Sequence, residues 1–148
     1  MNWKQEAIEK LKKLEAMQLS IENIPQEIKR LEIAACGLRG ATTDRMPVKG
    51  GGSRREDALL TNIVHRQELK HNREQAAHWV KATQNALSAL TMEEKLILTR
   101  MYIRPERGAL ERLSGELELE QSSLYRHRDR ALRKFTMALY GVDEGQVS

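Results

Sequence analysis

Apolar residues in the first third of the chain recur at alternating spacings of three and four positions. The series comprises Leu14, Met17, Ile21, Ile24, Ile28, Leu31 and Ala35. This heptad seam predicts a helix over residues 2–36 that buries one narrow face. Pro25 lacks a backbone N–H, which predicts a kink or a restart near Asn23, a candidate N-cap. Because so narrow a seam forms no core alone, the helix must pack on another helix, from this chain or from a second copy.

A second apolar stripe predicts another long helix over residues 56–89. Between the two helices, residues 37–55 are rich in glycine and lack periodicity, which predicts a mobile loop. We therefore expect residues 1–89 to form a coiled-coil-like helical hairpin that serves oligomerisation or partner binding. The pattern leaves open whether the two helices pair within one chain or between chains.

The pattern of apolar and polar positions predicts a compact helical domain over residues 90–140. A flexible tail is expected over residues 141–148. Thr91 and Glu94 have the spacing of a capping box at the start of a helix Met92–Tyr102. After a loop come a helix, a three-residue turn over residues 118–120, and a second helix. The predicted inward positions are Leu110, Leu113, Leu117, Leu119, Leu124, Ala131, Leu132 and Phe135. The expected fold class is all-α: a long N-terminal helical hairpin, then a compact helix-turn-helix domain.

Positive charge is concentrated on the second helix of that pair. Residues 124–135 carry five Lys or Arg and one Asp, an excess equal to the +4 of the whole chain. A helix-turn-helix places the N-terminal part of its second helix at base edges in the major groove of DNA. We expect base reading by Gln121, Ser122, Ser123, Tyr125 and Arg126. We expect phosphate binding by Arg128, Arg130, Arg133 and Lys134. The alternative is an amphipathic helix whose arginines are merely solvated, or are paired with Glu116, Glu118 and Glu120.

Three segments together resemble region 4 of bacterial sigma-70-type factors: Leu90–Leu98, Leu110–Ser114 and Leu124–Phe135. The layout of the whole chain is similar to small phage regulators of late operons, the ArpU/RinA type. The resemblance implies binding to promoter DNA and contact with host RNA polymerase. The family's turn usually has a glycine where this chain has Glu118, and its recognition helix usually starts with Ser or Thr where this chain has Glu120.

Other chemistry receives little support from the sequence. The single cysteine, Cys36, follows two alanines and is expected to be a small buried residue. The motif Glu68-x-x-His71 has the i, i+3 spacing of di-iron sites but lacks the second copy that such sites need. We therefore expect no metal, no cofactor and no enzyme activity. Without a signal peptide or an apolar run approaching ~20 residues, the chain is expected to be a soluble cytoplasmic protein of a bacterial host cell, without a membrane partner.

The leading hypothesis is a sequence-specific DNA-binding transcriptional regulator, a phage protein that acts at promoters with host RNA polymerase. Its expected partners are double-stranded promoter DNA, the polymerase, and a second copy bound through the N-terminal helices. Two alternatives stay open. One is a phage DNA-packaging component similar to a small terminase subunit, and the other is a helical adaptor that binds protein only.

Overall fold

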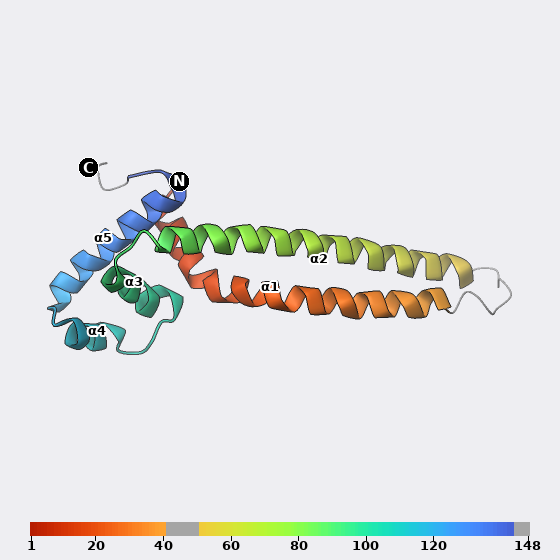
Figure 1. The fold of residues 1–148 in the computed structure, drawn as a ribbon, viewed down its shortest axis with the longest axis horizontal. Helices are drawn as coiled ribbons and strands as arrows, with labels where there is room; N and C mark the ends of the chain where they lie inside the picture. The colour runs from red at the N-terminus through yellow and green to blue at the C-terminus, as the bar shows by residue number, and fades with distance from the viewer. Residues whose placement is uncertain (41–50, 144–148) are drawn as a thin grey trace. The chain divides into compact units, whose positions relative to one another are not determined.

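The computed structural model describes residues 1–40 and 51–143, and the regular structure in these residues is entirely helical. The elements in chain order (Figure 1) are α1 Trp3–Gly40, α2 Gly51–Leu87, α3 Met92–Leu98, a π-helical segment Thr99–Ile103, α4 Ala109–Leu117 and α5 Gln121–Tyr140. The prediction of an all-α fold is confirmed. The chain divides into two compact units. We call residues 18–77 the hairpin unit, and residues 1–17 with 78–148 the terminal unit.

In the hairpin unit, α1 and α2 lie side by side and antiparallel (Figure 1). Asn62 sets their register, because its side-chain amide donates to the carbonyl of Leu31 at 2.9 Å. Its side-chain oxygen accepts from Nε of Arg66 at 2.8 Å, so both ends of this buried amide are bonded. A buried polar group with its partners in place favours one register over its neighbours. Within this unit, the two helices therefore pair inside one chain.

Both long helices extend further than the sequence pattern predicts. α1 continues through Gly37 to Gly40, and α2 already begins at Gly51, so the predicted loop over residues 37–55 is too wide at both ends. A glycine inside a helix costs about 1 kcal/mol relative to alanine. That cost is too small to end a helix whose neighbouring turns are already formed. The predicted mobility concerns residues 41–50, which lie outside the described residues.

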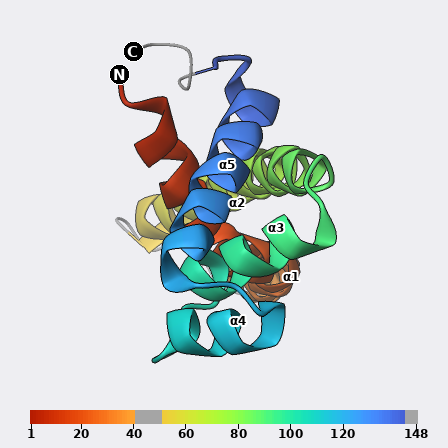
Figure 2. The ribbon, with the colours of Figure 1, turned by 90° about the vertical axis from the view of Figure 1, so that its left-hand side faces the viewer.

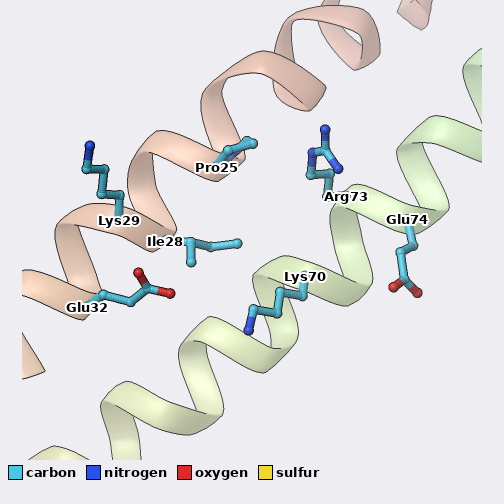
Figure 3. Close-up of a pocket in the computed structure, with 7 residues that line it drawn as sticks. All are labelled: Pro25, Ile28, Lys29, Glu32, Lys70, Arg73 and Glu74. Atoms are coloured by element: carbon cyan, nitrogen blue, oxygen red, sulfur yellow. The ribbon is translucent and has the colours of Figure 1, made fainter.

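Pro25 lies inside α1, which continues through it instead of restarting at Asn23. A proline leaves the carbonyl four residues earlier, that of Ile21, without its helical N–H donor. Nε of Arg73 on α2 donates to this carbonyl at 3.2 Å. Figure 3 shows Arg73 directed toward α1 beside a groove of about 560 Å³. The partner helix thus replaces the hydrogen bond that the proline removes.

Burial in the hairpin unit is limited to a narrow line. Leu31 and Ala35 are buried, whereas Ile21, Ile24 and Ile28 are only half-buried. Four large apolar side chains among the described residues of this unit point outward: Leu19 is 56 % exposed, Ile33 65 %, Leu60 61 % and Val64 46 %. Cys36 is also exposed, so its predicted burial is wrong. The residue follows Ala35 by one position, a rotation of about 100° around the helix, which takes it off the single face that α2 covers.

The terminal unit has a fully enclosed core. Figure 2 shows α5 crossing α3, with α4 below. The largest of its fully buried side chains are Leu11, Thr83, Ile97, Leu98, Leu113, Leu124, Leu132, Phe135 and Thr136. Leu11 belongs to the first turns of α1 and Thr83 to the end of α2, so both long helices contribute to this core. The division between the units therefore lies within the long helices and not at residue 89.

Aromatic residues anchor the C-terminal end of α5. The rings of Trp3 and Tyr140 have centroids 4.9 Å apart. Nζ of Lys10 lies 5.5 Å from the ring centroid of Trp79 and 5.4 Å from that of Tyr140. Cation–π contacts of this kind contribute about 0.5–1 kcal/mol each at exposed sites. The start of α1 and the end of α2 therefore help to hold α5 in place.

Candidate nucleic-acid interface

The helix that precedes the α4–α5 pair starts as predicted. Oγ1 of Thr91 accepts from the backbone N–H of Glu94 at 3.2 Å. Oε1 of Glu94 accepts from the backbone N–H of Thr91 at 3.2 Å, which completes the capping box. The helix is shorter than predicted, because α3 ends at Leu98 and a π-helical turn follows. A hydrogen bond of 2.7 Å from Arg104 N–H to the Thr99 carbonyl closes that turn.

Two helices joined by a three-residue turn lie where the sequence predicts them. α4 ends at Leu117, α5 begins at Gln121, and Glu118 in the turn adopts a left-handed backbone with φ 54°. A residue with a Cβ pays roughly 1–2 kcal/mol for this conformation. Two bonds between Ser114 and Leu119 hold it: Leu119 N–H donates to the Ser114 carbonyl at 3.1 Å, and the Ser114 hydroxyl donates to the Leu119 carbonyl.

The acidic residues at the end of α4 and in the turn form no ion pair with the arginines of α5 among the described residues. Glu116 pairs with Arg100 at 2.8 Å. Within the described residues, no ion pair joins Glu116, Glu118 or Glu120 to an arginine of α5. Glu120 occupies the N-cap position, where its negative charge is favoured by the partial positive charge of a helix N-terminus. Among the described residues, the structure therefore lacks the ion pairs between these glutamates and the arginines of α5, whereas the alternative of a solvated basic face stays open.

The five residues predicted to read bases occupy the first two turns of α5. Gln121, Ser122 and Arg126 are exposed. Ser123 is half-buried, and its Oγ accepts from Nη2 of Arg126 at 3.2 Å. Tyr125 is 39 % exposed, and the guanidinium of Arg128 lies over its ring, 4.9 Å from the ring centroid. Gln121, Ser122, Tyr125 and Arg126 are therefore the exposed members of this set, with the Tyr125 ring partly covered by Arg128.

The four residues predicted to bind phosphate have different surroundings. Arg130 is exposed, and the described residues offer it no hydrogen bond or ion pair. Arg128 pairs with Asp129 at 2.9 Å. Arg133 is held by Asp143, and Nζ of Lys134 lies 2.9 Å from Oε1 of Glu94. The sequence prediction treated all four cations alike, but three of them already have a carboxylate partner.

The side chain of Lys134 is 46 % exposed, but its ammonium is bound to a carboxylate that is buried. Its partner Glu94 is only 5 % exposed, and Oε2 of Glu94 is buried without a hydrogen-bond partner. Burial alone raises the pKa of Glu94, but the hydrogen bonds from Lys134 and Thr91 prevail and hold that pKa below its ordinary value of 4.5. Lys134 therefore compensates a buried carboxylate. Forty positions separate the two residues, and no local signal in the sequence indicates the pair.

Arg126, Arg130 and Arg133 form one line along α5. Their spacings of four and three positions put them on the same side of the helix. This side lies opposite the face that buries Leu124, Ala131, Leu132 and Phe135. We call these three residues the arginine line. Asp129 is exposed next to it and is engaged by Arg128 and by Nζ of Lys4 at 3.9 Å.

Sequence reasoning missed the partner of Arg133. Asp143 follows α5 by three residues, and its two carboxylate oxygens lie 2.6 Å and 2.8 Å from Nε and Nη2 of Arg133. Gly141 directly after the helix was the available signal, because a left-handed glycine at that position reverses the chain. The acid that follows such a glycine is then directed back along the helix.

The described residues contain no other cluster with obvious chemistry. Residues 1–40 and 51–143 hold no group of three or more His, Cys, Asp or Glu that could bind a metal ion. Across the same residues, no helix is both long and apolar enough to cross a membrane. A search of protein-family models, of curated proteins and of solved structures finds no match to this chain.

Proposed function

We propose that this protein is a sequence-specific DNA-binding transcriptional regulator in which α4, the turn and α5 act as a helix-turn-helix. One observation carries the proposal: α5 follows a three-residue turn and exposes the arginine line opposite its buried face. Basic side chains of a recognition helix bind phosphates, while its N-terminal side chains approach base edges. The arrangement supports a helix that lies in the major groove of DNA.

The dimensions of the arginine line suit that groove. Arg133 follows Arg126 by seven positions, which corresponds to about 10 Å along a helix. The major groove is about 12 Å wide. In the proposed complex, Gln121, Ser122 and Arg126 meet base edges. Arg130 binds phosphate directly, and Arg133 does so once Asp143 releases it.

The proposed biological setting is phage transcription. The resemblance of residues 90–135 to sigma region 4 supports promoter DNA and host RNA polymerase as partners. The exposed apolar side chains Ile33, Leu60 and Val64 support self-association through the hairpin unit. A dimer presents two copies of α5 to two half-sites on DNA, as other helix-turn-helix regulators do.

The test is a titration of the full chain against labelled DNA duplexes at several salt concentrations. One duplex is selected from a random pool for tight binding, and the other is a scrambled version of it. Arg126→Ala should reduce the preference for the selected duplex by about 1–3 kcal/mol. Arg130→Ala should weaken both duplexes about equally and reduce the salt slope by about one.

Lys81→Ala is the matched control, because it removes one exposed positive charge from α2 and leaves α5 intact. It should change neither the preference nor the slope. If no duplex binds at low salt, the proposal fails and a protein-only adaptor is favoured. If light scattering finds a ring of many subunits, a packaging component is favoured over a regulator.

A further inference from the structure

The chain reverses direction directly after α5. Gly141 ends the helix with φ 70°, and its N–H donates to the carbonyl of Met137 at 2.8 Å. This left-handed C-cap turns the following residues back toward the helix. Two positions later, Asp143 reaches Arg133, which lies ten residues before it in the chain.

The contact between Asp143 and Arg133 is bidentate. Oδ1 of Asp143 lies 2.6 Å from Nε of Arg133, and Oδ2 lies 2.8 Å from Nη2. The Asp143 side chain is 24 % exposed and the Arg133 side chain 44 %. Two parallel N–H···O bonds are also the geometry in which arginine binds a phosphate group. The carboxylate therefore occupies donors that a DNA phosphate would use.

The contact with Asp143 involves an arginine of the surface that is proposed to bind DNA. Arg133 is the C-terminal member of the arginine line, while Arg130 in the same line has no partner among the described residues. Asp143 both cancels one positive charge on the line and blocks its hydrogen-bond donors. A partly exposed ion pair at the protein surface contributes little to stability, so a phosphate can displace it.

We infer that Asp143 is an intramolecular competitor of DNA phosphate, and that it lowers DNA affinity by holding Arg133 in a closed contact. This inference rests on the proposed function and adds a regulatory contact to the same surface. Because the competition concerns a phosphate, it affects all DNA sequences to the same degree. Any process that draws Asp143 away, such as binding of the segment around it to a partner protein, would raise the affinity for DNA.

The experiment compares the full chain with Asp143→Asn, which keeps the side-chain size and removes the charge. Binding is measured by fluorescence anisotropy on the selected duplex and on the scrambled duplex at several salt concentrations. Asp143→Asn should bind both duplexes about five-fold more tightly, which corresponds to the upper end of the range for ion pairs at a protein surface. Its salt dependence should be steeper by about 0.9, because one more phosphate is contacted.

Two further variants make the result specific. In an Arg133→Gln background, Asp143→Asn should leave the affinity unchanged, because the competing arginine is gone. Glu68→Gln removes an exposed acid of the hairpin unit and serves as the control for net charge, with an expected change below about two-fold. Thermal unfolding of each variant establishes that the fold is retained.

The failure of the inference and the failure of the proposed function give different results. If neither the natural chain nor any variant binds a duplex at low salt, the proposed function is wrong. If the natural chain binds DNA and Asp143→Asn binds no more tightly, the inference is overturned. An equal gain from Asp143→Asn with and without Arg133 also overturns it, since the effect would then be one of net charge.

Discussion

The hairpin unit and the terminal unit bury apolar side chains to different extents with the same residue types. Ile24 in the seam of the hairpin unit is half-buried, whereas Ile97 in the terminal unit is 0 % exposed. Two antiparallel helices cover only one face of each other. Helices that cross from several directions enclose a side chain completely. Burial here depends on how many elements surround a position and not on how apolar the residue is.

The buried polar groups of the two units also differ, in how completely they are hydrogen-bonded. Asn62 in the hairpin unit has both ends of its amide bonded. Glu94 in the terminal unit is charged and buried, and one of its oxygens has no partner. A low-dielectric interior strengthens the bond from Lys134 and makes the unpaired oxygen costly. The stability of the buried Glu94 carboxylate therefore depends on its hydrogen bonds to Lys134 and to the Thr91 backbone.

The largest expected effect tests this difference with one substitution type at two positions. Ile97→Ala should destabilise the protein by about 2–5 kcal/mol, because it leaves a cavity in an enclosed core. Ile24→Ala should cost about 1–2 kcal/mol, because much of that side chain already contacts water. Urea unfolding followed by circular dichroism measures the total loss, and hydrogen exchange assigns the loss to each unit.

Protein concentration provides the control for the two isoleucine variants. If Ile24→Ala costs as much as Ile97→Ala, the seam of the hairpin unit is more deeply buried in solution than two helices allow. A dependence of that cost on protein concentration would then identify a second copy as the covering element. Equal costs without such a dependence would contradict the comparison itself.

A smaller effect is expected from the buried carboxylate of the terminal unit. The pKa of Glu94 is lowered in the folded state, so its contribution to stability is present above about pH 4.5 and is lost as the pH falls below that value. Glu94→Gln should cost about 1–3 kcal/mol at neutral pH, through the loss of a charged hydrogen bond. The difference between variant and natural chain should shrink in acid, as measured by urea unfolding across pH.

Glu93→Gln is the matched control, since Glu93 is the exposed neighbour of Glu94 on α3. Its effect should stay within about 0.5 kcal/mol, as is usual for surface positions. A loss for Glu94→Gln that is constant across pH would show that the carboxylate contributes packing rather than charge.

The smallest expected effect concerns the turn between α4 and α5. Glu118→Gly should stabilise the terminal unit by about 0.5–1 kcal/mol, because glycine adopts φ 54° without the strain of a Cβ. Glu120→Gly is the control, because Glu120 has an extended backbone with φ −67° and gains no such relief. Differential scanning calorimetry resolves both changes, and equal effects at the two positions would rule out strain at Glu118.

Sequence reasoning located most of the fold and only part of the candidate site. The capping box at Thr91 and the turn at residues 118–120 were predictable, because each depends on residues within a few positions of one another. The buried face of α5 followed from its helical period. The ends of the long helices were less predictable, since Gly37 and Gly51 are compatible with both a helix and a loop.

The amino-acid sequence by itself determined which segments are helical and which face of each helix is apolar, because hydrogen bonding and periodicity are local. Only the tertiary structure decided which charges remain available on α5. It pairs Lys134 with Glu94 and Arg133 with Asp143, and it leaves Arg126 and Arg130 without a carboxylate partner among the described residues. Charge pairing depends on which groups meet in space, and residues forty positions apart meet only once the helices have packed.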